Sequence, residues 1–76
     1  MSEVEWMRIF AGNLRSWMDE LRITQSELAE EANLAESTIS NYINQVKMPS
    51  VRSVINLAYA LDCTVSDLID FGDMIE

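Results

Sequence analysis

Apolar residues recur along this chain at the three- and four-residue intervals of helices, and nowhere do they alternate with polar residues for long enough to indicate a strand. The first stripe comprises Trp6, Phe10, Leu14, Trp17 and Leu21. Their spacing places them on one side of a helix over about residues 3–21, so we expect that side to face the core. Arg8, Arg15 and Arg22 recur every seven residues along the same helix, and we interpret them as a solvated line rather than a row of phosphate contacts.

The next helix is predicted to begin at a capping box. In Thr24-Gln25-Ser26-Glu27 the threonine hydroxyl is placed to accept from the amide of Glu27, while the glutamate accepts from the amide of the threonine. Asn33 tolerates the left-handed conformation in which helices often end, so this helix is short. A third helical pattern starts at about residue 36.

The third helix carries an unusual polar side. Ile39 and Ile43 point one way, and the opposite side presents Ser37, Ser40, Asn41 and Asn44. Serine and asparagine are poor helix formers because their side chains compete for the backbone, so stability alone would not select four of them. A requirement other than helix stability is therefore expected to account for this face.

Two further caps predict two further helices. Pro49 disfavours helix at the preceding residue, and Ser50 is placed to cap a fourth helix. The apolar residues of that helix are Val51, Val54, Ile55, Ala58 and Leu61. Thr64 is placed to cap a short fifth helix around Leu68, Ile69 and Phe71. The sequence thus predicts an all-α fold of five helices.

Length and composition make this one domain over residues 1–76. A chain of 76 residues and 8.7 kDa cannot supply two cores, and 49% hydrophobic residues suffice for one. No apolar run approaches the ~20 residues of a membrane span, and the amino end lacks the basic start of a secretion signal. We therefore expect a cytoplasmic protein without membrane contact.

The available side chains argue against an enzyme. The chain has no histidine and a single cysteine, Cys63, so an internal disulfide and the usual zinc ligand sets are excluded, and no metal or other cofactor is expected. There is also no pairing of nucleophile with base and no glycine loop for phosphate. Cys63 is predicted to lie in the core beneath the turn between the fourth and fifth helices.

The charge of the chain is strongly acidic but unevenly distributed. Thirteen acids against five bases give a net charge of -8, the opposite of the usual footprint of a nucleic-acid binder. Residues 36–53, with one acid and two bases, carry +1 and form the only non-acidic third. A ligand with negative charge would therefore approach on the side of the third helix and the loop after it.

Residues 24–44 have the spacing of a helix-turn-helix. From Leu14 to about Ile69 the chain resembles the XRE-like, lambda-type repressor family of DNA-binding domains. The matching residues are Leu14-Arg15, Thr24-Gln25, Leu28-Ala29, Ala32, Leu34, Ile39-Ser40, Tyr42, Pro49-Ser50, Leu57, Ala58, Leu61, Thr64 and Leu68. The resemblance implies a compact five-helix domain that binds double-stranded DNA and regulates transcription, most commonly as a repressor.

The resemblance also assigns roles to individual positions. Glu36, Ser37 and Asn41 stand where the family reads base edges; an asparagine there bonds adenine bidentately and a glutamate accepts from the cytosine amino group. The positions that hold backbone phosphates are Gln25, Ser40, Asn44, Lys47 and Arg52. Thr38 and Tyr42 lie on the flank of the third helix, where packing is expected.

Three residues depart from the family pattern. Ala35 stands where a serine or threonine usually caps the recognition helix, at a cost of about 1 kcal/mol. Met18 replaces a commonly basic residue of the first helix, and Gln45 replaces the glycine that often ends the third. These changes preserve the fold but reduce the means of holding DNA.

Two functions remain open on the sequence. The first is a sequence-specific regulator that dimerises, weakly, through Phe71, Met74 and Ile75 at the carboxyl end and takes no small-molecule ligand. The second is an acidic interaction module with the same fold, an antirepressor or adaptor that meets a basic protein and does not bind DNA.

Overall fold

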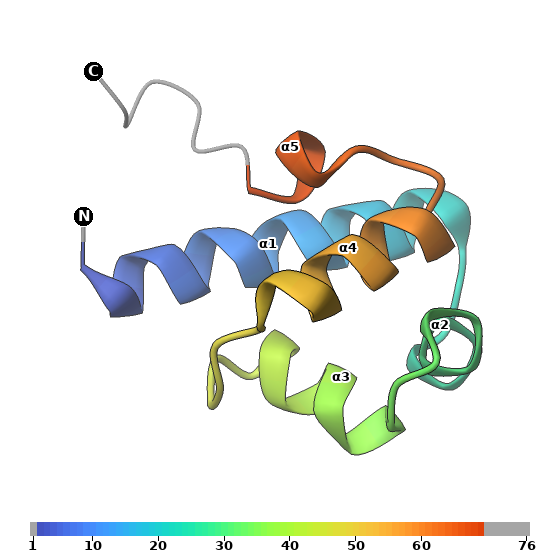
Figure 1. Cartoon of the computed structure of the whole chain (residues 1–76), viewed down its shortest axis with the longest axis horizontal. Helices are drawn as coiled ribbons and strands as arrows, with labels where there is room; N and C mark the ends of the chain where they lie inside the picture. Colours follow the sequence, from blue (N-terminus) through green and yellow to red (C-terminus); the bar gives the residue numbers. More distant parts are fainter. Residues whose placement is uncertain (1, 70–76) are drawn as a thin grey trace.

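The computed structural model describes residues 2–69, which form five helices and no strand over that range (Figure 1). The helices are α1 (Glu3–Leu21), α2 (Gln25–Ala32), α3 (Glu36–Ile43), α4 (Val51–Ala60) and α5 (Val65–Leu68). The predicted all-α fold and its element order are confirmed. Phe71, Met74 and Ile75 lie outside the described residues.

Four of these helices begin at a side-chain cap. The predicted box at α2 is present: the amide of Glu27 donates to Oγ1 of Thr24 over 3.1 Å, and the amide of Thr24 donates to Oε1 of Glu27 over 3.0 Å. A second box joins Thr64 and Asp67 at α5, and Ser2 and Ser50 cap α1 and α4. Only α3 begins without a side-chain cap, because Ala35, the residue before it, has no side-chain acceptor.

The first four helices end in one common way. In each, a residue with positive φ is followed by a residue whose amide bonds the carbonyl five positions back; the four left-handed residues are Arg22, Asn33, Gln45 and Asp62. At α3, for example, the amide of Val46 donates to the carbonyl of Asn41 over 2.8 Å. This double-bonded turn is the Schellman motif, here built four times without glycine.

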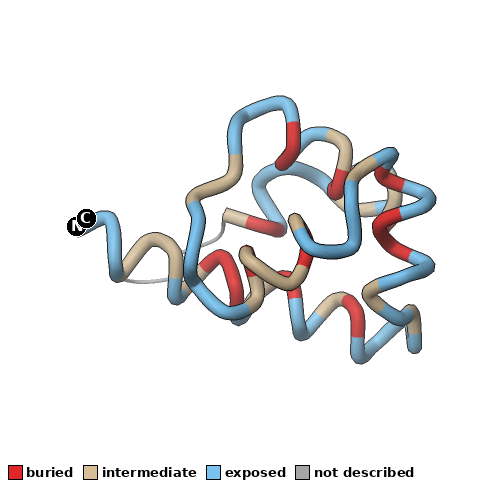
Figure 2. Tube along the Cα trace, turned by 90° about the horizontal axis from the view of Figure 1, so that it is seen from below, coloured by how far each residue is buried: buried red, intermediate tan, exposed pale blue. Residues whose placement is uncertain are grey.

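The core lies where α1 and α4 meet the other helices. Its most deeply buried large side chains are Phe10, Leu14, Leu28, Ile39, Leu57, Leu61 and Leu68. Figure 2 shows short buried stretches alternating with exposed and half-buried ones along the chain. α3 packs on α1 and α2, whereas α5 packs on α1 and α4. The third and fifth helices therefore lie on opposite sides of the molecule (Figure 1).

Three apolar residues named in the predicted helices are exposed. Leu21, predicted in the core stripe of the first helix, is 48% exposed because it is the last residue of α1, at the turn that leads away to α2. Val51 and Ile55 are 77% and 50% exposed. They stand one turn apart along the edge of α4, next to the side on which Val54, Leu57 and Ala58 fill the core.

Within the described part of the chain, no helix combines the length and apolar character that crossing a bilayer requires.

Candidate nucleic-acid interface

The position of α3 is fixed by its buried side. Ile39 and Tyr42 are both buried in the core. The ring of Tyr42 meets Phe10 edge to face, with centroids 6.0 Å apart and planes at 77°. Phe10 in turn stacks on Trp6 at 5.5 Å. Aromatic contacts thus run from α1 to α3 and confirm that Tyr42 is a packing residue.

The opposite side of α3 presents the polar residues in the expected row. Glu36, Ser37 and Asn44 are exposed, whereas Ser40 and Asn41 are half-buried. Nδ2 of Asn44 donates to Oγ of Ser40 over 3.2 Å, one turn apart. The three candidate base-reading residues therefore share one face with two candidate phosphate contacts, and a hydrogen bond orients those two relative to each other.

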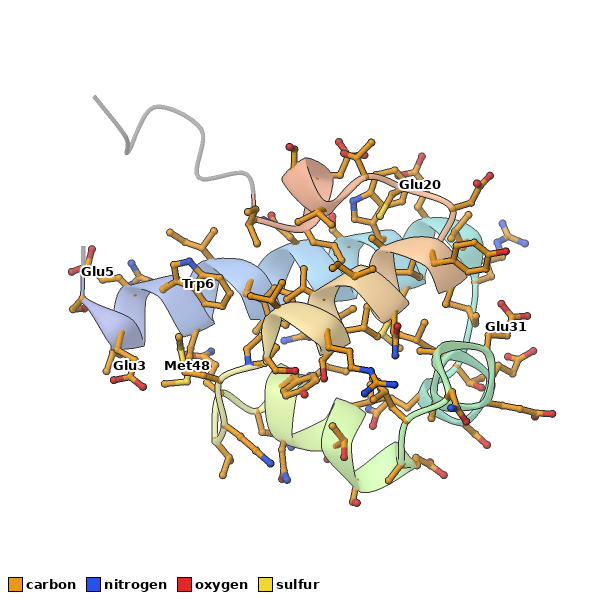
Figure 3. All side chains as sticks on the ribbon, in the orientation of Figure 1. Glu3, Glu5, Trp6, Glu20, Glu31 and Met48 are labelled. Carbon is orange, nitrogen blue, oxygen red and sulfur yellow. The ribbon has the colours of Figure 1, made fainter. Side chains whose placement is uncertain are left out.

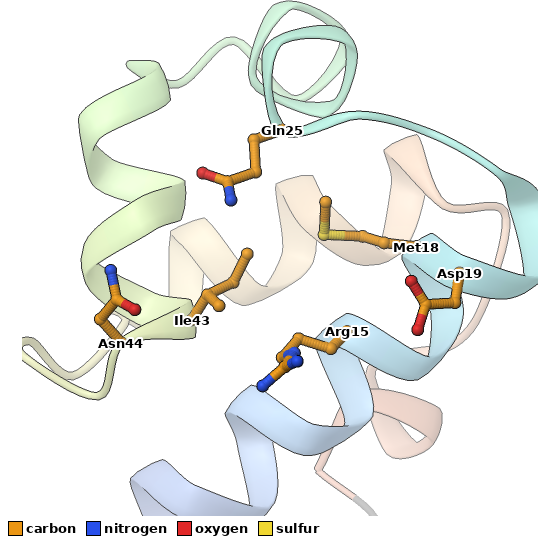
Figure 4. Close-up of a pocket in the computed structure, with 6 residues that line it drawn as sticks. All are labelled: Arg15, Met18, Asp19, Gln25, Ile43 and Asn44. Atoms are coloured by element: carbon orange, nitrogen blue, oxygen red, sulfur yellow. The ribbon is translucent and has the colours of Figure 1, made fainter.

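A depression of about 320 Å³ lies beside the carboxyl end of α3, between α1, α2 and α3 (Figure 4). Its lining residues are Arg15, Met18, Asp19, Gln25, Ile43 and Asn44. Gln25 reaches it from the first turn of α2 and Asn44 from the end of α3, so the fold brings together two of the predicted phosphate contacts. Arg15, interpreted from the sequence as solvated, adds a cation from α1.

The amino end of α2 suits an anion in one respect and opposes it in another. Its free amides and the positive end of the helix dipole favour negative charge near Gln25. Glu27, however, belongs to the same turn, and the amide and hydroxyl of Thr24 bond its carboxylate and lower its pKa. Because Glu27 stays ionised and Asp19 lines the same depression, the amides and the arginine of this site must outweigh the negative charge of two carboxylates.

The remaining two phosphate candidates are placed differently. Lys47 is exposed in the loop after α3, next to Val46, which is 70% exposed. Arg52 lines a separate depression between α2 and α4, together with Glu31 and Asn33. The structure therefore places Lys47 in the loop that follows α3 but does not bring Arg52 together with Gln25 and Asn44.

Val46 is a surface feature that sequence reasoning missed. At the other three Schellman turns the residue in the same place, Ile23, Leu34 or Cys63, packs against the core. At the end of α3 that residue remains outside, one position before Lys47. The sequence shows an apolar residue at this position of the turn, as at the other three helix ends. Only the structure shows that Val46 has no core residues beneath it.

The described residues hold no grouping of three or more histidine, cysteine, aspartate or glutamate side chains suited to a metal ion. Cys63, predicted to lie in the core, is half-buried and packs against the core. Burial, and then the nearby charges of Asp67 and Asp62, raise the pKa of its thiol, which disfavours the reactive thiolate.

Comparison with known proteins agrees with this geometry. The family model of the Cro/C1-type HTH DNA-binding domain matches residues 13–73. No curated protein matches the chain. The fold is similar to the restriction-modification controller protein C.AhdI from Aeromonas hydrophila, with a TM-score of 0.79 and 24% identity over 82% of this chain and 94% of that one.

Two further solved structures are more similar in sequence. The SOS-response transcriptional repressor LexA from Eubacterium rectale gives a TM-score of 0.83 and 26% identity over 97% of this chain and 79% of that one. A chain of the SinR protein/SinI protein complex gives a TM-score of 0.77 and 27% identity over 82% of this chain and 61% of that one. With the family model covering most of its length, the chain belongs to the Cro/C1-type helix-turn-helix DNA-binding domains.

Proposed function

We propose that this domain regulates transcription by reading a specific double-stranded DNA site with α3 in the major groove, and that it acts as a repressor. The main support is that α3 has two different sides. Ile39 and Tyr42 are buried and hold the helix against the core, whereas its outer side carries only short polar residues and one glutamate. The family match favours DNA binding over a module that never meets DNA. Repression is suggested by the similar LexA chain. The protein would act in the cytoplasm, without catalysis.

Base readout is assigned to Glu36, Ser37 and Asn41. Glu36 and Ser37 form the exposed first turn of α3, the part of a recognition helix that enters the groove most deeply. Asn41 follows one turn later on the same side, with an amide that matches the N6 and N7 atoms of adenine. Its partial burial limits its rotamers, which favours one hydrogen-bonding geometry.

Phosphate contacts are assigned to Gln25, Ser40, Asn44 and Lys47, with Arg52 at the margin. Gln25 and Asn44 flank the depression that Arg15 and Asp19 also line, so one phosphate there would meet two amides and a guanidinium, opposed by one carboxylate. The small number of cations limits nonspecific affinity, because that affinity comes from phosphate neutralisation. Recognition therefore depends on base contacts to an unusual degree.

We further propose a weak homodimer, since one recognition helix contacts too few base pairs to find a unique site. Its contact is assigned to residues 68–76, with Phe71, Met74 and Ile75 as the apolar part. Asp70, Asp73 and Glu76 alternate with them, so like charges would oppose each other and added salt should strengthen the dimer. Sedimentation equilibrium of the full chain and of a chain ending at Asp70 tests this assignment; two monomers at every salt concentration would refute it.

The DNA assignment is tested by selecting binding sites from random duplexes and then comparing variants on the best site. Asn41→Ala should weaken that site by about 1–3 kcal/mol and relax the preference at one base pair. Lys47→Ala should weaken all sequences alike. Asn56→Ala is the matched control, because this half-buried asparagine of α4 lies away from α3. No selected sequence, or an Asn41→Ala variant identical to the parent, would contradict the proposal.

A further inference from the structure

An apolar ridge runs along the outside of α4. Val51, Ile55 and Tyr59 follow one another at four-residue intervals and are 77%, 50% and 88% exposed. Over eight residues the ridge extends about 12 Å. Side chains spaced by four residues form the ridges with which one helix packs into the grooves of another. Single exposed apolar residues are ordinary, but three in register on one helix indicate an unfilled packing surface.

Hollows adjoin this ridge at both of its ends. At the Val51 end, a groove of about 280 Å³ is lined only by apolar side chains, among them Trp6, Met48, Val65 and Ile69. At the other end, a depression of about 340 Å³ is lined by Ile55 and Tyr59 together with Glu31, Asn33 and Arg52. Neither shares a lining residue with the depression beside Gln25 and Asn44. Apart from Arg52, the marginal phosphate candidate, this surface is therefore separate from the proposed DNA contacts.

The charges around the ridge are mainly negative. Glu3, three residues before Trp6, lies on the same side of α1, and Figure 3 shows Glu3, Trp6 and Met48 gathered at one end of the molecule and Glu31 at the other. Asp62, exposed, follows Tyr59 by three residues. Arg52 is the single base that lines either hollow. The apolar ridge thus has acids near both ends.

We propose that this surface, the α4 ridge, docks an amphipathic helix of a partner protein, with aliphatic residues at four-residue spacing on one face and lysine or arginine at both ends. The ridge and its hollows supply the shape of a helix-packing site, and the acids supply charge complementarity. A second copy of this chain fits poorly, since it would bring acids against acids between molecules of net charge -8. Such docking would let a regulator on DNA hold another protein.

The experiment uses fluorescence of Trp6, which lines the apolar groove. In a full-length Trp17→Phe background, Trp6 is the remaining tryptophan. The probe is a synthetic 16-residue helical peptide with leucines at four-residue spacing and two lysines at each end, and its twin has glutamates in place of the lysines. The lysine peptide should shift Trp6 emission to the blue and bind at least tenfold more tightly than the glutamate peptide.

Two variants then locate the binding. Ile55→Ser with Tyr59→Ser, both at exposed positions, should weaken the lysine peptide at least tenfold, and Glu31→Gln should weaken it two- to fivefold. Glu20→Gln removes an exposed acid of α1 and should change nothing. Equal affinity for both peptides, an unshifted Trp6, or full binding by the Ile55→Ser, Tyr59→Ser variant would overturn the proposal. Self-association of the chain that the same double variant abolishes would assign the ridge to a second copy instead.

Discussion

The side-chain amide of Asn13 in α1 donates a 2.8 Å hydrogen bond to the carbonyl oxygen of Leu68, the last residue of α5, across 55 positions of sequence. Because α5 has only four residues, this bond and the burial of the Leu68 side chain add substantially to its packing on α1 and α4. Asn13→Ala should lower the free energy of unfolding by about 1–3 kcal/mol, since a partly buried carbonyl loses its donor.

Chemical denaturation measures this loss, and Gly12→Ala is the control at the neighbouring position. Gly12 is exposed and a Cβ there meets no atom within 4 Å, so this substitution should stabilise the helix by about 0.5–1 kcal/mol. An Asn13→Ala variant as stable as the parent would show that the bond to α5 contributes nothing.

The missing cap of α3 should be restorable. Ala35 has the extended backbone of a cap, with φ -73° and ψ 145°, but no acceptor. Ala35→Ser should therefore raise stability by about 1 kcal/mol, or roughly 4–8 °C in Tm for a domain of this size. Thr24→Ala, which removes an existing cap, should have the opposite sign. Equal Tm values for Ala35→Ser and the parent would contradict this account.

Glycine in place of the left-handed residue after α3 should increase the stability of the domain. Gln45 has φ 61°, a conformation that costs a side chain about 1–2 kcal/mol and glycine nothing, whereas glycine loses about 0.5–1 kcal/mol more chain entropy on folding. Gln45→Gly should thus stabilise the domain by up to about 1 kcal/mol. Asn33→Gly should gain less, because asparagine tolerates this region, and the reverse ranking in urea denaturation would disprove the argument.

Stability should fall at acid pH in part through Glu27. Its pKa is lowered in the folded state by hydrogen bonds from Thr24, so its contribution is complete above the unfolded pKa and is lost as the pH falls through the folded pKa. Glu27→Gln keeps an acceptor for the capping box but cannot titrate. The difference in Tm between parent and variant should shrink as the pH drops from neutrality to strong acid, and a constant difference would exclude the effect.

DNA binding should depend only shallowly on salt. About two to four cations, among them Lys47 and Arg15, stand where phosphates could reach them, so log K should fall against log salt with a slope of about -2 to -4. Lys47→Ala should reduce that slope by about 1. Gel shifts on the selected site at several salt concentrations give the value, and a slope of -8 or steeper would be incompatible with these contacts.

The sequence predicted the helices well because their boundaries are set by interactions between residues close together in the sequence. Thr24, Asn33, Ser50 and Thr64 each act through atoms within a few residues, so caps and turns could be read without knowing the fold. For α3, spacing predicted the burial of Ile39, but Ile43 is only half-buried and Tyr42, expected on the flank, is buried.

What the sequence could not supply depends on distant packing. Val51 and Ile55 have the spacing of core residues, and only the position of α4 among its neighbours shows that they face outwards. Likewise the grouping of Arg15, Gln25 and Asn44 joins three helices, so no local pattern contains it. The family resemblance could assign a phosphate contact to each residue separately, but only the structure shows how these residues are arranged in space.

The way α3 is held has a consequence for how such domains diversify. Its direction is set by Ile39 and Tyr42 beneath it and by main-chain bonds at its carboxyl end, and none of these uses the side chains of Glu36 or Ser37. Those two positions are therefore free to drift or to be exchanged without loss of the scaffold. A single backbone of this kind can accumulate new DNA preferences by substitutions in one exposed turn.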